Sequence, residues 1–270
     1  TTALPSKLDK RSDSGGGFVH ASISPNGKVL LAADYNGGRL VGFPIGTDGK
    51  LGEATSTVAF GSGANTHSSG FHPSGQWAYA PNKGLNKIAQ FEVDAGSGVL
   101  TRRADLSTEG RGPRMFTITP NGKYAYVMFE DDGSVEGYRV GDSGLLERID
   151  REATLPNEGW GAHALVHPGG KYLYVSARDS SALVSFTIAD DGDLTQLEHV
   201  GSEGKAPRCF DIDDSGKWLV VANQGDNDQA AVGSLAVFAI GDDGKLSKRG
   251  SIIGNLKAPT AVAIVNRPKR

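Results

Sequence analysis

Four side chains in this sequence have the types needed for acid–base chemistry on an anionic carbonyl compound: His67, Arg114, Glu130 and Arg178. Arginine binds carboxylates and phosphates through two parallel charge-assisted hydrogen bonds and can stabilise a developing oxyanion. A glutamate held ionised beside such cations can accept a proton from water, and a histidine that titrates near neutral pH can return one. The set therefore suits a small anionic substrate that carries a carbonyl, or an alkene conjugated to a carboxylate.

Two of these residues occupy a position that changes its chemistry in every copy of an internal repeat. Each copy is marked by a turn whose last glycine is Gly27, Gly75, Gly122, Gly170 or Gly216. The eighth residue after each glycine is, in order, Tyr35, Lys83, Glu130, Arg178 and Gln224. Repeat symmetry places all five on the same side of their copies, so we expect them to converge on one site. Solvated loop ends would also be polar, and the spacing alone leaves that structural interpretation open.

A second set of polar residues stands where the first strand of each copy should begin. Six residues before the turn proline, or before its equivalent Asp214, come His67, Arg114 and Arg208; five residues before it come His20 and His163. If each copy forms one blade of a ring, its first strand lines the central channel, so these imidazoles and guanidiniums should lie near the channel axis. The offset of one residue can turn the two groups toward different faces. A packing role for His20 and His163 stays open.

The element that must position these residues is a unit of about 47 residues written five times, a period that falls in the range of propeller repeats. Glycine and proline separate each copy into four short runs rich in Val, Tyr, Phe and Leu. In the third copy the runs are Arg114 to Thr119, Tyr124 to Phe129, Ser134 to Val140 and Leu145 to Ala153. No stretch shows the helical period. Four antiparallel strands per copy predict an all-β protein, a β-propeller whose blades pack face to face.

We predict a single β-propeller domain over residues 1–270, with five full blades and two end strands. The predicted blades cover residues 18–60, 67–108, 112–155, 161–202 and 206–254. The predicted end strands cover residues 3–10 and 258–265. These two strands supply only the first and last members of a further blade. Such a blade would leave unpaired edges and an apolar face, so we expect self-association through it.

The composition limits the classes of partner. With 270 residues and 38% apolar content the chain can bury a large core, and a formal charge of -3 argues against binding nucleic acid. No apolar run is long enough to cross a bilayer, so we expect a soluble protein with no membrane partner and favour the cytoplasm. The single cysteine, Cys209, excludes an internal disulfide. No Cys and His cluster has metal-ligand spacing, so we expect neither metal nor cofactor.

Short motifs along nearly the whole chain carry a resemblance to a known family. They are Ala33-Asp34-Tyr35-Asn36-Gly37-Gly38, Thr66-His67-Ser68 ahead of His72-Pro73, Gly112-Pro113-Arg114, Val127-Met128-Phe129-Glu130, Ser176-Ala177-Arg178, Pro207-Arg208, Ala222-Asn223-Gln224 and Ala258-Pro259-Thr260. In order and spacing the chain resembles the lactonase-type propellers, which include 6-phosphogluconolactonases and 3-carboxymuconate cyclases. The resemblance implies a seven-bladed propeller without an obligatory metal and with its site at the channel mouth. Against these seven blades, we expect the chain to lack about one and a half blades at its N-terminal end.

The resemblance also implies roles for the candidate residues. By this resemblance His67, Arg114, Glu130 and Arg178 are the catalytic residues. The substrate-binding candidates are Tyr35, Lys83, Arg208 and Gln224, to which the first-strand histidines His20 and His163 are added. We therefore expect general acid–base hydrolysis of a small acidic sugar lactone, similar to that of a 6-phosphogluconolactonase. The alternatives are a lactonizing cyclase acting on a carboxymuconate-type substrate, and a non-enzymatic propeller that binds a ligand or a protein.

Overall fold

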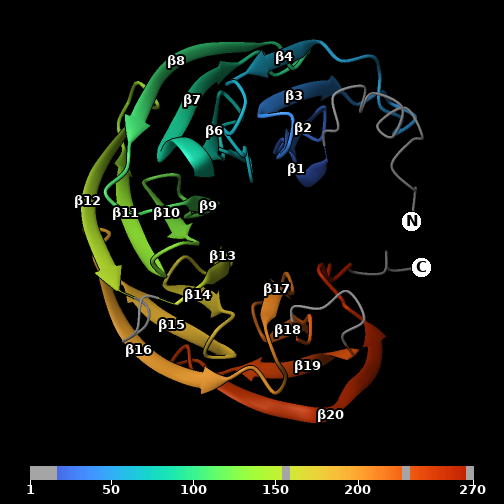
Figure 1. Ribbon diagram of the computed structural model, residues 1–270. Helices are drawn as coiled ribbons and strands as arrows, with labels where there is room; N and C mark the ends of the chain where they lie inside the picture. Colours follow the sequence, from blue (N-terminus) through green and yellow to red (C-terminus); the bar gives the residue numbers. More distant parts are fainter. Residues whose placement is uncertain (1–16, 154–158, 227–231, 266–270) are drawn as a thin grey trace. The chain divides into compact units, whose positions relative to one another are not determined.

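The structure, a computed structural model, describes residues 17–153, 159–226 and 232–265 (Figure 1). In these ranges the regular structure is β-strand, apart from one 3-10 turn, η2 (Lys83–Leu85). The strands form five antiparallel sheets of four strands each. The prediction of an all-β protein with four-stranded antiparallel blades is therefore confirmed. The predicted end strand 3–10 lies outside the described residues.

Each sheet is a meander in which strands that follow one another in the sequence lie side by side. The first sheet contains β1 (Phe18–Ile23), β2 (Val29–Asp34), β3 (Arg39–Pro44) and β4 (Ser56–Ala59). The second contains β5 (Gly70–Phe71), β6 (Trp77–Asn82), β7 (Lys87–Val93) and β8 (Leu100–Ser107). The third contains β9 (Pro113–Ile118), β10 (Tyr124–Phe129), β11 (Ser134–Val140) and β12 (Leu146–Ala153).

The last two sheets repeat the same order of strands. The fourth contains β13 (Gly161–Val166), β14 (Tyr172–Ala177), β15 (Ala182–Ile188) and β16 (Leu194–Gly201). The fifth contains β17 (Pro207–Ile212), β18 (Trp218–Asn223), β19 (Val232–Ile240) and β20 (Leu246–Lys257). The protein divides into two compact units, and the third sheet contributes to both. Unit 1 comprises residues 1–116 and 140–147, and unit 2 comprises residues 117–139 and 148–270.

The second strand of each sheet is largely buried. All six residues of β2 are buried, and in β10 and β14 every residue after the first is buried. A strand covered on both faces reads as a continuous apolar run, which explains why these segments lack a strict alternation of polar and apolar residues. In unit 1 the core includes Leu31, Leu40 and Phe91. In unit 2 it includes Phe210 and Phe238.

A tyrosine in the second strand of three sheets closes a repeated hydrogen bond, here called the tyrosine latch. The hydroxyl groups of Tyr79, Tyr126 and Tyr174 each donate to a glycine carbonyl at 2.8 Å. The acceptors are Gly144, Gly192 and Gly244, which all have positive φ angles. Burial raises the pKa of each of these tyrosines above its usual range. Each latch joins a second strand to the hairpin turn of the following sheet within one unit.

The predicted end strand at residues 258–265 is wrong, because the structure places these residues outside any strand. Instead β20 continues past the predicted blade boundary at residue 254, since Val232 of β19 still pairs with Lys257. Ala258 then adopts a φ of 39°, which turns the backbone out of the extended conformation that a ladder requires. The segment is held by a side chain instead: the backbone N–H of Ile264 donates to Asp211 Oδ2 at 2.7 Å.

Candidate functional site

The five variable residues of the repeat all lie directly after a second strand, as the repeat register predicts. They follow the strands that end at Asp34, Asn82, Phe129, Ala177 and Asn223. Arg178 is buried, and the other four side chains, those of Tyr35, Lys83, Glu130 and Gln224, are half-buried. The position is therefore a shared place in the fold, one residue beyond each strand. Its chemistry differs from sheet to sheet.

Buried polar residues hold the backbone at three of these strand ends. Asp34 Oδ1 accepts hydrogen bonds from the backbone N–H groups of Gly17 and Gly37, at 3.0 and 2.9 Å. Asn82 Oδ1 accepts the hydroxyl of Thr66 at 2.7 Å. Asn223 Nδ2 donates to the carbonyl of Ser202 at 2.9 Å. The loops that carry Tyr35, Lys83 and Gln224 therefore begin from strand ends fixed by hydrogen bonds.

In unit 1 the segment Thr66–Ser69 reaches three sheets. Thr66 forms an isolated bridge with Asn82 at the end of β6. The Oγ of Ser68 accepts the N–H of Phe116 in β9 at 3.3 Å, and the Oγ of Ser69 lies 2.8 Å from the Oγ of Ser22 in β1. Thr66, Ser68 and Ser69 are buried. The segment that carries His67 is therefore fixed by neighbours on both sides of it.

His67 contacts one of the variable residues directly. Its ring meets that of Tyr35 edge to face, with centroids 5.5 Å apart and an interplanar angle of 84°. The backbone N–H of His67 donates to Pro81, and that of Lys83 donates to Asn65, so the backbone at Lys83 runs beside the backbone at His67. The structure corrects one detail, because β5 begins only at Gly70. His67 lies ahead of the first strand, where a buried side-chain network and an isolated bridge hold the backbone.

His20 and Arg114 interact electrostatically within unit 1. Burial lowers the pKa of His20 to about 4, and the positive charge of Arg114 adds to this effect. The Nδ1 atom of His20 accepts the backbone N–H of Ser69 at 3.3 Å, which requires a lone pair at that nitrogen. His20 is therefore a neutral imidazole at pH 7 with its proton on Nε2, and Arg114 supplies the positive charge of this pair.

In unit 2 Glu130 and Arg178 form an ion pair. Arg178 Nη2 donates to Glu130 Oε1 at 2.6 Å, and the two side chains are 17% exposed for Glu130 and 5% exposed for Arg178. The guanidinium also lies 5.1 Å from the ring centroid of Trp160. The repeat register did not indicate Trp160, because only this copy has a tryptophan ahead of its first strand. The available signal was its residue type, since the sequence has three tryptophans.

The other candidates of unit 2 are held in two further contacts. Arg208 Nη1 donates to Gln224 Oε1 at 3.2 Å, which joins a first-strand residue to a variable residue. The ladder between β17 and β18 shifts register between Pro207 and Cys209, so Arg208 occupies a β-bulge. A bulge re-aims a side chain relative to the regular pleat. His163 packs edge to face on Phe210, with centroids 4.9 Å apart.

The candidate residues therefore come together as pairs within each unit. Unit 1 brings together Tyr35 with His67, and His20 with Arg114. Unit 2 brings together the remaining pairs, Glu130 with Arg178 and Arg208 with Gln224. The predicted catalytic set divides into His67 and Arg114 in unit 1 and Glu130 and Arg178 in unit 2. Within the described ranges, no three His, Cys, Asp or Glu side chains are grouped to hold a metal ion, and no helix could cross a membrane.

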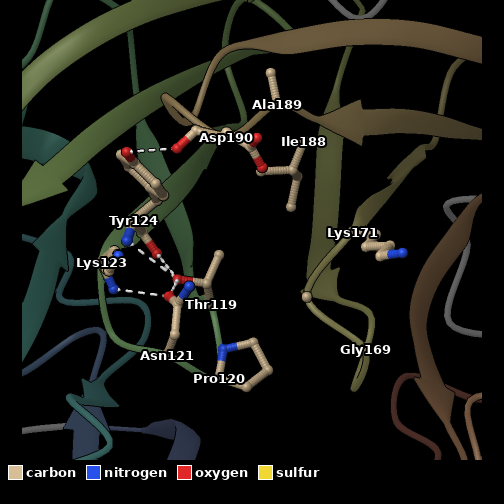
Figure 2. Close-up of a pocket in the computed structure, with 11 residues that line it drawn as sticks. Thr119, Pro120, Asn121, Lys123, Tyr124, Gly169, Lys171, Ile188, Ala189 and Asp190 are labelled. Atoms are coloured by element: carbon tan, nitrogen blue, oxygen red, sulfur yellow. Dashed lines mark hydrogen bonds between the residues drawn. The ribbon is translucent and has the colours of Figure 1, made fainter.

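A pocket of about 410 Å³ in unit 2 contains none of the candidate residues (Figure 2). It is lined by the turns that precede β10 and β14 and by the hairpin after β15, including Asn121, Lys171 and Asp190. Glu130 and Arg178 follow the opposite ends of β10 and β14, which are six residues long. At about 3.3 Å per residue, those strands separate the pocket from the ion pair by roughly 20 Å.

Five copies of a repeat of about 47 residues, each folded as a four-stranded antiparallel sheet, define the class of proteins built on a β-propeller. The chain belongs to one family of that class, the lactonases with a seven-bladed β-propeller, which it matches over residues 3–265. The sequence resemblance to the lactonase-type propellers is thereby confirmed.

Several relatives of known name are similar to most of the chain. The 6-phosphogluconolactonase of Pectobacterium carotovorum is 31% identical over 217 residues, which are 77% of this chain and 64% of the relative. That of Formosa agariphila is 32% identical over 240 residues, 82% of this chain and 68% of the relative. The chain thus spans about two thirds of the length of these relatives.

Solved structures show the same fold. A Bacteroides fragilis protein, provisionally named a 6-phosphogluconolactonase, matches with a TM-score of 0.81 at 26% identity, over 91% of this chain and 72% of its own. The periplasmic gluconolactonase of Pseudomonas aeruginosa matches with a TM-score of 0.80 at 24% identity, over 93% and 74% of the two proteins. The second likeness concerns the fold alone.

Proposed function

We propose that this protein hydrolyses a small acidic sugar lactone of the 6-phosphogluconolactone type. Membership of the lactonase family and the names of the Pectobacterium and Formosa relatives support the reaction class. The observation that carries the proposal is the largely buried Glu130–Arg178 ion pair at two strand ends. It pairs a proton acceptor with a fixed cation, which are the two groups needed to hydrolyse an anionic ester.

In the proposed reaction Glu130 accepts a proton from a water molecule, whose oxygen attacks the lactone carbonyl carbon. The carbonyl oxygen becomes an oxyanion, which Arg178 stabilises by charge and hydrogen bonding. When the oxyanion collapses, the ring C–O bond breaks and the departing alkoxide takes up a proton, leaving an acyclic hydroxy acid. We assign the return of this proton to protonated Glu130, which regains its negative charge. His67 and Arg114, both in unit 1, stay candidates for acid–base chemistry and for binding the acid group, from their residue types and the family resemblance.

Two variants of the ion pair test the assignment. Glu130→Gln keeps the shape of the side chain but removes the proton acceptor, and Arg178→Gln removes the cation. We expect each to lower kcat for the lactone by at least about a hundredfold, the usual scale for one acid–base group or one oxyanion donor. The assay follows acid release at pH 7 with 6-phosphoglucono-δ-lactone and subtracts the uncatalysed rate.

A second ion pair offers a matched control. Arg103 and Glu92 lie 2.6 Å apart, like Arg178 and Glu130, but their side chains are 41% and 51% exposed. Glu92→Gln should therefore leave kcat unchanged and cost little stability. If Glu130→Gln and Glu92→Gln both retain wild-type turnover, the assigned role of Glu130 is wrong.

The two other candidate functions give different results in the same preparation. A lactonizing cyclase would leave the sugar lactone unhydrolysed and would close a carboxymuconate to its lactone, with loss of the diene absorbance. A binding propeller would bind the lactone or another ligand, yet hydrolysis would proceed at the uncatalysed rate. Catalysed acid release that Arg114→Ala reduces would support the lactonase.

A further inference from the structure

Trp160 is a large aromatic side chain that folding leaves nearly half exposed. Its side chain is 46% exposed, although it directly precedes β13, whose first two residues are buried. Isolated exposed hydrophobic residues are common on protein surfaces and need no explanation alone. The surroundings of Trp160 distinguish it, because its ring lies against the guanidinium of Arg178, the partner of Glu130.

The backbone of Trp160 is held on both sides by the loop that follows β14. The N–H of Arg178 donates to the carbonyl of Trp160 at 2.8 Å, and the N–H of Trp160 donates to Asp179 Oδ2 at 3.3 Å. The next residue, Gly161, accepts Arg178 Nη2 through its carbonyl at 3.4 Å. The backbone that carries the indole is therefore hydrogen-bonded to the two residues that follow β14.

The contact with Arg178 also orients the guanidinium. Arg178 Nη2 is committed to Glu130 and to the carbonyl of Gly161, whereas its buried Nε has no hydrogen-bond partner among the described residues. A cation over an indole ring is attracted by the negative face of the ring, which helps to hold the charge without a hydrogen bond. The indole therefore lies over a guanidinium whose position is fixed by its ion pair with Glu130.

We infer that Trp160 is a stacking platform that selects ring-form sugar lactones at the Glu130–Arg178 pair. One face of a sugar ring carries C–H groups with partial positive charge, which pack well on the electron-rich face of an indole. The ring hydroxyl and acid groups then remain free for charged neighbours. This inference rests on the proposed function, which it deepens by naming the feature of the substrate that is recognised: a closed polyhydroxylated ring.

The test measures binding of a ring that cannot react. The probe is D-glucono-δ-lactam, in which a ring N–H replaces the ester oxygen, and the acyclic acid D-gluconate serves as the reference ligand. Loss of one aromatic stacking contact costs on the order of tenfold in a dissociation constant. We therefore expect Trp160→Leu to weaken lactam binding about tenfold in calorimetric titrations, with a smaller effect on gluconate.

Trp218 provides the control. Its side chain is 44% exposed, close to the value for Trp160, but it begins β18 and so lies at the opposite strand end from the variable position. Trp218→Leu should bind the lactam like the wild type. Trp160→Phe, which keeps an aromatic ring, should retain most of the affinity but lose the change in tryptophan fluorescence that the lactam produces in the wild type and in Trp218→Phe.

The outcomes separate this inference from the proposed function. Catalysed lactone hydrolysis with wild-type lactam affinity in Trp160→Leu overturns the inference and leaves the lactonase proposal intact. A wild-type protein that hydrolyses the lactone but binds no lactam at millimolar concentration also overturns the inference. Lactam binding that depends on Trp160, without catalysed hydrolysis, would support the platform and refute the lactonase.

Discussion

The neutral state of His20 predicts a specific dependence of stability on pH. In the folded protein burial, assisted by the charge of Arg114, lowers the pKa of His20 to about 4, against an ordinary value of 6.5. Between these two values the unfolded state binds one proton more than the folded state. The free energy of unfolding therefore falls as the pH drops from about 6.5 toward 4, and this contribution is fully present above pH 6.5.

The size of the effect follows from the two pKa values. One proton of difference corresponds to a slope that approaches about 1.4 kcal/mol per pH unit, so the total loss by pH 4 is on the order of 3 kcal/mol. In His20→Asn the amide oxygen can still accept the N–H of Ser69, but the amide cannot titrate. The difference in unfolding free energy between wild type and variant isolates the imidazole from the carboxylates that titrate in the same range.

The assay is urea denaturation at several pH values between 7.5 and 4.5, with His199→Asn, the loss of an exposed imidazole, as a control for the substitution itself. We expect the wild type to lose its stability advantage over His20→Asn as the pH falls. Parallel curves for wild type and His20→Asn across this range would refute the reasoning, as would an NMR titration of the His20 ring with a midpoint above pH 6.

Three further predictions concern packing and association. Tyr174→Phe should lower the free energy of unfolding by about 1–3 kcal/mol in urea denaturation, because it leaves a buried carbonyl unpaired. Tyr172→Phe loses an exposed hydrogen bond of the same 2.8 Å length and should cost less than about 1 kcal/mol. Equal costs for the two variants would contradict this reasoning. Gly161→Ala should be destabilising by about 1–3 kcal/mol in the same assay, because a Cβ there would lie 2.4 Å from a backbone oxygen, while Gly201→Ala meets nothing within 4 Å and should be near neutral. Self-association is expected from exposed apolar residues such as Ile253, which is 56% exposed in β20, and sedimentation showing a stable monomer at micromolar concentration would argue against it.

The turns and strand ends could be predicted from the sequence because they depend on local chemistry. The repeated turn glycines, such as Gly122 and Gly170, have φ angles of 73° and 74°, a conformation that few other residues tolerate. A period anchored by such glycines locates the second strand of each sheet, and therefore also the variable residue that follows that strand. This is why the repeat register alone locates Glu130 and Arg178 one residue beyond β10 and β14.

The rest of the candidate site depends on how neighbouring sheets approach one another. The effect of Arg114 on His20 joins β9 to β1, and the stacking of Trp160 on Arg178 depends on the residue type at one position ahead of β13. The spacing of residues within a repeat does not specify these contacts. The predicted strand at 258–265 failed for a related reason, because apolar composition does not reveal the φ of 39° at Ala258 that ends the ladder.

The variable residues lie outside the strand ladders, so ligand specificity can change while the fold is kept. In the second sheet the last ladder pair is Asn82 with Lys87, and in the fifth it is Asn223 with Ser234. Lys83 and Gln224 stand one residue past those pairs, so replacing either side chain leaves the ladder hydrogen bonds in place. Duplication of such a unit provides five positions whose side chains can change while the backbone fold stays the same. Selection, natural or in the laboratory, can therefore retune ligand preference sheet by sheet.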